Sequence, residues 1–123
     1  MGGLFEFLER VKEKPGMYLG TASVTHLRLF LVGYRFAAIA ELNITSSDEE
    51  VDFYRNFQPW LKKRLRVYTT NSWDKIILIQ SANEKEAFQS VFVFLDEFRQ
   101  REPSEDIDPI LVESSSNATK KFA

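Results

Sequence analysis

The hydrophobic positions of this chain recur at the spacing of an α-helix in successive stretches. Leu4, Leu8 and Val11 fall at i, i+4 and i+7, which predicts a first helix that ends before Pro15. A last helix is expected after Asn83, which begins a sequence typical of a capping box. The apolar stripe of that last helix comprises Phe88, Val91, Phe92, Leu95 and Phe98.

The most apolar stretch, residues 24–42, is hydrophobic almost all round the predicted helix. Because a helix of that kind is buried on every side, we expect it at the centre, with the other helices packed around it. Ser23 is suited to cap its first turn. Gly33 lies inside it, where glycine costs about 1 kcal/mol relative to alanine. A type II turn is predicted at Pro15 and Gly16. We expect another backbone to approach Gly33 closely, and the turn at Pro15–Gly20 is the candidate.

The middle of the chain has a weaker helical pattern. Residues 43–52 are polar and predict a linker. Pro59 is disfavoured inside a helix but tolerated in its first turn. A regular helix is therefore expected only over residues 58–65, after a looser lead-in at residues 53–57.

Residues 67–79 suit either a helix or a β-hairpin, because short apolar runs are ambiguous, and we prefer a helix over residues 73–82. The sequence as a whole predicts an all-α fold, a single-domain bundle of about five helices around the central apolar helix. The helical domain is expected to span residues 1–101. Residues 102–123 are expected to form an acidic, partly ordered C-terminal extension.

Composition narrows the class of protein. The chain has 123 residues, 44% of them hydrophobic, which suits one globular domain with a real core. A net charge of −2 argues against a dedicated nucleic-acid binder. There is no cysteine, no apolar run of the roughly 18 residues that a membrane span needs, and no signal-peptide pattern. We therefore expect a cytoplasmic protein that does not bind a membrane.

Candidate catalytic motifs are weak. The stretch Lys14–Gly20, Lys-Pro-Gly-Met-Tyr-Leu-Gly, is similar to one in gyrase-type ATPases, but the following helix lacks the Glu and Asn that those enzymes need. His26 is the only histidine and has no evident partners for acid–base or metal chemistry. We therefore expect no enzyme activity, no cofactor and no metal.

Two further features have structural explanations that we prefer. The basic run at residues 62–66 is interpreted as a solvated helix face rather than a phosphate-binding site. Trp60 and Trp73 occur at helical spacing beside apolar neighbours, so core packing is preferred to a role as interface anchors.

Acidic residues gather in two segments that are interpreted either as solvated loops or as a patch that meets a basic partner. Charge complementarity of that kind speeds association and disfavours wrong partners. The first segment contains Asp48, Glu49, Glu50 and Asp52. The second contains Glu102, Glu105, Asp106 and Asp108.

The arrangement of motifs over about residues 4–100 resembles a family of small helical bacterial proteins that serve as immunity proteins of contact-dependent growth inhibition and polymorphic toxin systems. The matching stretches are Lys14–Gly20, Leu27–Tyr34, Phe53–Leu61, Ser72–Ile77 and Ala87–Phe98.

This resemblance implies a protein that binds a cognate toxin C-terminal domain and covers its active site or substrate surface. Toxin domains that are nucleases tend to be basic, since they hold nucleic acid. Our hypothesis is that the eight acidic residues above form part of the toxin-binding surface. A helical adaptor or regulator without a toxin partner is the main alternative, and a small enzyme or nucleic-acid-binding module is a third.

Overall fold

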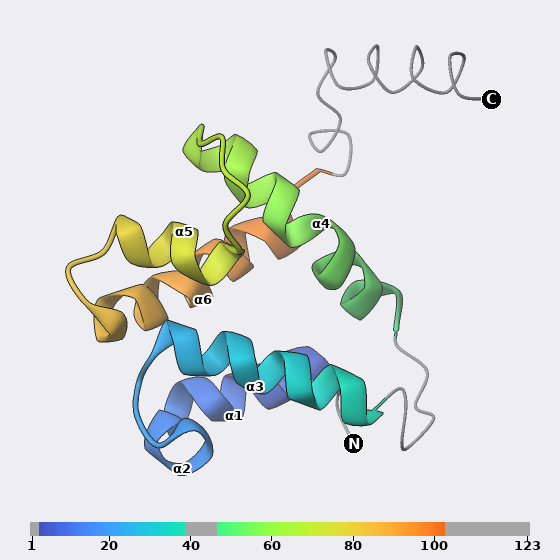
Figure 1. Ribbon diagram of the computed structural model, residues 1–123. Coiled ribbons are helices and arrows are strands. Elements are labelled where there is room, and N and C mark those ends of the chain that lie inside the picture. Colours follow the sequence, from blue (N-terminus) through green and yellow to red (C-terminus); the bar gives the residue numbers. More distant parts are fainter. Residues whose placement is uncertain (1–2, 39–46, 103–123) are drawn as a thin grey trace.

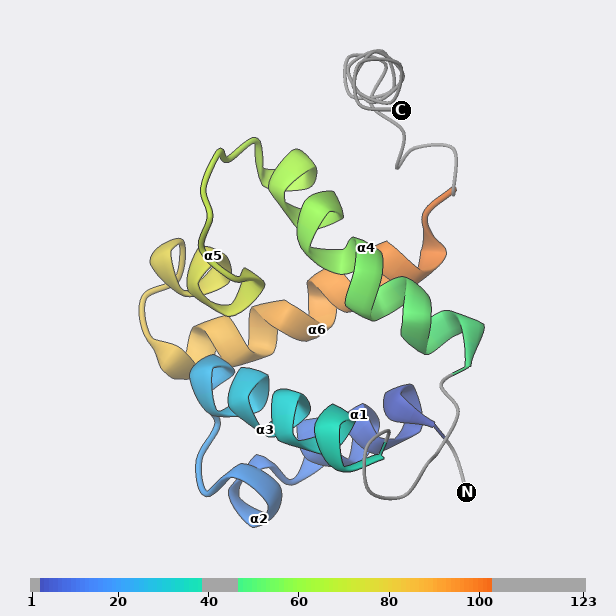
Figure 2. The same ribbon diagram turned by 45° about the vertical axis from the view of Figure 1, so that its right-hand side comes forward.

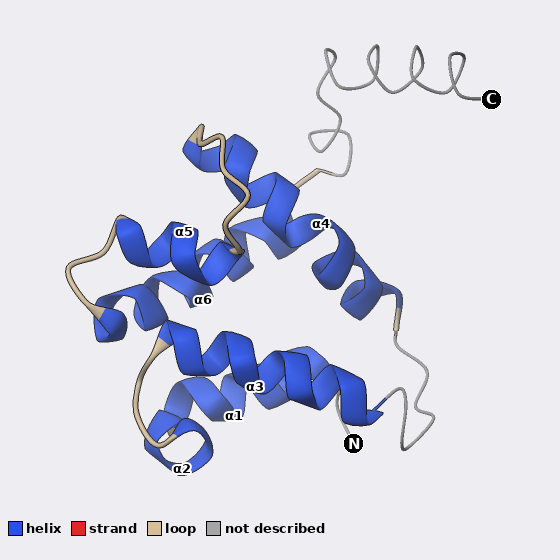
Figure 3. Ribbon diagram, in the orientation of Figure 1, coloured by secondary structure: helices blue, strands red, loops and turns tan. Residues whose placement is uncertain are grey.

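The computed structural model describes residues 3–38 and 47–102, and all of its regular structure in those ranges is helical (Figure 3). The expected all-α bundle is therefore confirmed. The helices are α1 (Leu4–Glu13), α2 (Pro15–Leu19), α3 (Val24–Phe36), α4 (Asp48–Leu65), α5 (Trp73–Ile79) and α6 (Glu84–Gln100).

Helix α6 lies at the centre of the bundle. It contacts α3, α4 and α5, and Lys12 of α1 lies over the ring of Phe92 in α6. On one side, α1 and α3 run beside each other with α2 at their common end, and on the other side lie α4 and α5 (Figures 1 and 2). Stacking of Phe7 in α1 on Phe30 and Tyr34 in α3 joins the first pair.

The helix expected over residues 24–42 is shorter and less buried than its composition suggests. Regular α-helix ends at Phe36, and residues 39–42 lie outside the described residues. Val24, Leu27 and Leu31 are buried, but other apolar side chains of α3 face solvent. A Cβ added at Gly33 would meet nothing within 4 Å, so the expected close approach of another backbone is wrong. The central position belongs to α6 rather than α3.

Helix α4 is continuous from Asp48 to Leu65, so the linker and the looser lead-in expected before residue 58 are wrong over residues 48–57. Its first turn is capped by Ser47, whose side chain accepts a hydrogen bond from the backbone N–H of Glu50. Acidic residues in that turn also suit the positive end of the helix dipole. These contributions, with three buried apolar side chains, offset the hydrogen bond lost at Pro59.

Two shorter helices form, one where the sequence predicts a turn and one where it allows either a helix or a hairpin. Residues 15–19 form helix α2 instead of the expected type II turn, with Pro15 in its first turn and Gly20 as a left-handed cap at φ 82°. Proline suits the first turn because its missing N–H would have had no helical partner there. Helix α5 at residues 73–79 confirms the preferred helix over the hairpin.

One part of the core is an aromatic cluster where α4, α5 and α6 meet. The ring of Phe57 packs edge-on against Trp73 and Phe98 and lies parallel to Trp60. Trp73 is 8% exposed and Trp60 is partly buried, so the expected core packing of both tryptophans is confirmed. Such pairs add about 0.5–1.5 kcal/mol each beyond their buried area. This packing fixes α5 against α4 and thereby one wall of the groove described next.

Candidate binding groove

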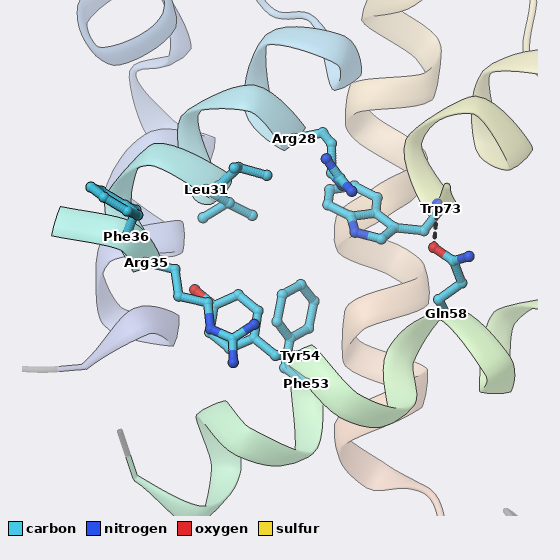
Figure 4. A pocket seen from close by; sticks show the side chains of 9 residues that line it. Arg28, Leu31, Arg35, Phe36, Phe53, Tyr54, Gln58 and Trp73 are labelled. Atoms are coloured by element: carbon cyan, nitrogen blue, oxygen red, sulfur yellow. Dashed lines mark hydrogen bonds between the residues drawn. The ribbon is translucent and has the colours of Figure 1, made fainter. Parts of the chain in front are cut away.

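A groove of about 470 Å³ lies between α3, α4 and α5 (Figure 4). Ligand pockets in proteins commonly have volumes of about 300–1,000 Å³. The groove is open to solvent and mostly apolar, with a few polar side chains. It is lined by Arg28, Leu31, Val32, Arg35, Phe36, Phe53, Tyr54, Gln58 and Trp73.

The apolar lining has a buried floor and an exposed rim. Leu31, Phe53 and Trp73, one from each helix, are at most 8% exposed and belong to the main core. Val32 and Phe36 are 51% and 66% exposed on α3. Exposed apolar side chains beside a cavity are typical of sites that bind another molecule. The groove is thus an extension of the core that the described residues leave uncovered.

Gln58 holds the two walls of the groove together. Its Oε1 accepts a hydrogen bond of 3.0 Å from the backbone N–H of Trp73, and its Nε2 donates to the carbonyl of Asn71 at 3.2 Å. The side chain of Ser72 makes no capping bond to the backbone of α5 and donates to the carboxylate of Asp74 instead. The Gln58 amide therefore supplies the acceptor that the first turn of α5 needs.

Two arginines give the groove a positive charge. The Arg35 guanidinium lies 4.3 Å from the centre of the Tyr54 ring, a cation–π contact (Figure 4). Arg28 is half-buried, and its guanidinium has no hydrogen-bond or ion-pair partner among residues 3–38 and 47–102. A charged donor that lacks an internal acceptor is able to bind a carboxylate or phosphate from outside.

Tyr54 contributes a polar group that is buried beneath this face. Its hydroxyl has no hydrogen-bond partner in the described part of the chain. Burial raises the pKa of Tyr54 to about 12, with a smaller contribution from the nearby Glu50 carboxylate, and Arg35 acts in the opposite direction. The phenol is therefore neutral at physiological pH. The lining of the groove therefore suits an apolar group that lies next to an anion.

The acidic segment predicted at residues 48–52 is at the start of α4, and most of its carboxylates have internal partners. Glu49 pairs with Arg99 at 2.9 Å. Glu50 accepts a hydrogen bond of 3.0 Å from the backbone N–H of Leu4, which caps α1. These two carboxylates are therefore engaged in holding α4 to α6 and α1.

Asp52 is the most firmly held acidic residue of the set. Both of its carboxylate oxygens accept from the Arg101 guanidinium, at 2.8 and 3.0 Å, and one also accepts from Asn56. The hydrogen bond from Arg101 is the main reason that the pKa of Asp52 lies below its usual value, and burial opposes it. The Arg101 side chain is only 8% exposed. This pair closes the C-terminal end of α6 onto α4.

The remaining predicted site residues are dispersed. Asp48 is exposed at the first position of α4, and Glu102 is exposed at the last described residue. Neither forms an ion pair within the described ranges. Glu105, Asp106 and Asp108 lie outside the described residues. The start of α4 is therefore a mixed-charge surface in which arginines neutralise much of the negative charge.

The other candidates from the sequence have structural roles. The Nδ1 of His26 lies 3.2 Å from the carbonyl of Leu19, where it ties the start of α3 to α2. In the basic run at residues 62–66, Arg64 pairs with Glu97 on α6 and both side chains are largely exposed. Across residues 3–38 and 47–102 there is no group of acidic or histidine side chains that could hold a metal ion.

Glu84 is a structural site that sequence reasoning missed. Its carboxylate accepts from the side chains of Ser23 and Thr25 and from the backbone N–H of Thr25, so it joins the first turns of α3 and α6. Burial alone would raise the pKa of Glu84, but these hydrogen bonds outweigh it and the pKa is lowered. The contact fixes one end of α3, whose other end borders the groove.

Comparison of the chain with protein-family models, with curated proteins and with solved structures found no match. Within the described ranges, none of the helices combines the length and the apolar character required to cross a membrane.

Proposed function

We propose that this protein is an immunity protein, which binds a cognate toxin domain and covers its active site or substrate surface. The observation that carries the proposal is the uncovered groove between α3, α4 and α5, whose apolar rim and two arginines suit a protein partner. Interfaces of this kind place apolar anchors in a pocket and use arginines for specificity. The assignment of the partner as a toxin rests on the resemblance in sequence.

The acidic residues keep a smaller part in this proposal than their number suggests. The charges of the carboxylates that pair with Arg99 and Arg101 are compensated by these guanidinium groups, so they attract a basic toxin only weakly. Asp48 and Glu102 are exposed, and they remain available to guide association with a basic surface. Neutralising these two residues should reduce the association rate at low salt and leave the dissociation rate nearly unchanged, because rim charges act mainly on encounter.

Helix α3 offers a matched pair of substitutions that separates binding from stability. Val32 lines the groove and is 51% exposed, whereas Leu29 is 63% exposed and is not part of the lining. Val32→Asp and Leu29→Asp therefore place the same charge on two exposed positions of one helix. Both should lower stability by less than about 1 kcal/mol, and Leu29→Asp should cost slightly more, because leucine has a higher helix propensity than valine. Only Val32→Asp should abolish binding of the partner.

The experiment begins with the gene immediately upstream of the one that encodes this chain. The C-terminal domain of its product is co-expressed with wild-type protein, with Val32→Asp and with Leu29→Asp, and growth and complex formation are measured. Rescue by the wild type and by Leu29→Asp, but not by Val32→Asp, is the expected outcome. Absence of rescue by the wild type would contradict the immunity function, and equal rescue by all three would contradict the groove as its site.

An adaptor that binds a segment of a different protein is the second candidate. The size of the groove favours it, since about 470 Å³ holds a few side chains of one partner segment rather than a broad surface. Recovery of a complex that depends on Val32, together with no effect on growth in the presence of the neighbouring domain, would favour this function.

A further inference from the structure

We propose that residues 104–113 of this chain dock intramolecularly in the groove between α3, α4 and α5. The sequence of this segment is Ser-Glu-Asp-Ile-Asp-Pro-Ile-Leu-Val-Glu. It combines acidic and apolar residues in the way that the groove combines arginines with apolar side chains. The docking itself does not depend on whether the groove also binds a toxin.

Charge is the first reason to place this segment in the groove. Of the 16 Lys and Arg residues, all but Lys120 and Lys121 precede residue 102, whereas the segment itself has no basic residue. Within the described ranges, Arg28 has no ion-pair partner, and Arg35 contacts only the face of the Tyr54 ring. The segment supplies four carboxylates to these two cations: Glu105, Asp106, Asp108 and Glu113.

Apolar composition is the second reason. The segment contains Ile107 and the run Ile110–Val112, and the groove offers exposed Val32 and Phe36 above a buried floor. Pro109 disfavours helical geometry at the residue before it and favours an extended chain there. β-Branched residues on either side also suit an extended conformation. An extended segment is the form that fits along the groove between α3, α4 and α5.

The point at which the chain leaves the bundle makes the docking possible. Arg101, the penultimate described residue, is bound to Asp52, and the next two residues of α4, Phe53 and Tyr54, line the groove. The segment therefore has only to cross α4, whose diameter with side chains is about 10–12 Å. Residues 103–110 reach about 26 Å when extended, at roughly 3.3 Å per residue. The length of chain is sufficient.

Attachment to the bundle reduces the affinity that docking requires. A segment on a short flexible tether experiences an effective concentration in the millimolar range. Half occupancy of the groove then needs a dissociation constant of only about 1 mM for the free segment. A docked segment would compete with any partner that uses the same groove, so that partner must displace it.

The test uses the full-length chain, which contains no cysteine, so that a single label can be attached. A nitroxide is placed at Ser115→Cys, and nuclear magnetic resonance measures relaxation of the Val32 methyl groups and the Trp73 indole N–H. These resonances should broaden strongly, whereas Met17 and Ile79, which are exposed but outside the groove, should not. Equal, weak broadening at all four positions would overturn the proposal.

Charge exchange distinguishes docking from general proximity. In Arg28→Glu/Arg35→Glu the selective broadening should be lost, and addition of Asp106→Lys/Asp108→Lys to the same chain should restore it. Arg55→Glu, at an exposed position of α4 outside the groove lining, is the control and should keep it. Broadening that persists in the double arginine variant would contradict the proposal.

Mixing experiments separate docking within one chain from exchange between chains. Isotope-labelled protein without nitroxide is combined with nitroxide-labelled protein without isotope. Broadening in the mixture as strong as that within one chain would show that the segment occupies a second copy and would overturn the intramolecular proposal. No partner is present in any of these measurements, so they succeed or fail independently of the immunity function.

Discussion

Most charged side chains at the start of α4 are paired within the protein, whereas the two arginines of the neighbouring groove are available to bind another group. At the start of α4, Glu49, Glu50 and Asp52 all contact donors from other helices or from the chain just after α6. In the groove, Arg28 has no hydrogen-bond or ion-pair partner within the described ranges, and Arg35 contacts a ring face. The first region was expected from sequence to bind a partner, yet its charges stabilise the fold. Availability for binding depends on which charges the fold leaves unpaired.

The largest expected effect on stability is that of Arg101→Ala. Removing this guanidinium leaves the Asp52 carboxylate without its main partner and removes a hydrogen bond of 2.8 Å to the carbonyl of Phe98. We expect the free energy of unfolding, measured with urea, to fall by about 2–3 kcal/mol. Arg99→Ala breaks a pair whose side chains are 37% and 61% exposed and a cation–π contact with Phe5, and should cost only about 1 kcal/mol. Equal costs would contradict the distinction between the two pairs.

Acid should weaken the same contact. The pKa of Asp52 is lowered in the folded protein, chiefly by Arg101, so its contribution is complete above the ordinary aspartate value of 3.8 and is lost as the pH falls through the folded pKa. As the pH falls, the urea midpoint should therefore decline less steeply in Asp52→Asn than in the wild type. Asp48→Asn, at an exposed residue without such a pair, is the control. A decline of wild-type steepness in Asp52→Asn would assign the acid sensitivity to other groups.

On the groove side, Tyr54→Phe should stabilise the protein. It removes a buried hydroxyl that has no partner in the described part of the chain, which should raise the free energy of unfolding by about 1 kcal/mol. Absorbance titration should also lose the phenol that ionises at about 12. Tyr68→Phe, at a fully exposed position, should change neither stability nor that step. A loss of stability in Tyr54→Phe would reveal an acceptor for the hydroxyl outside residues 3–38 and 47–102.

The smallest effect is expected for Arg28→Ala. With no internal ion pair to break, the free energy of unfolding should change by less than about 0.5 kcal/mol. The free energies of unfolding of this variant and of Arg101→Ala, both measured with urea, compare an arginine of the groove directly with an arginine that stabilises the fold. A cost above about 1 kcal/mol would mean that Arg28 serves the fold and is not free to bind.

Sequence periodicity is sufficient to predict the buried residues of helices that have a single face against the core. The stripes of α1 and α6 were predicted residue by residue, and Leu4, Leu8, Val11, Phe88 and Phe98 are all buried. These elements have one apolar face, so the helical period alone identifies the residues that are buried.

The groove could not be predicted in the same way, because it combines side chains from three helices. The apolar residues all round residues 24–42 predict burial on every side, although Leu29, Val32 and Phe36 are exposed. Periodicity does not say which neighbours cover each face of a helix. The extent of α4 differs from the prediction for a local reason, since the Ser47 cap and the buried residues before Pro59 outweigh the hydrogen bond that this proline removes. Arg28 and Arg35 had no distinguishing sequence pattern.

Pro59 also divides α4 into two parts that need not open together. It has no N–H to donate to the carbonyl of Arg55, so the ladder of backbone hydrogen bonds is interrupted there. Phe53, Tyr54 and Gln58 line the groove on one side of the break, and Arg64 pairs with α6 on the other. Slow amide hydrogen exchange in such proteins follows cooperative units. The wall of the groove is therefore able to fluctuate open at a lower free-energy cost than unfolding of the whole helix.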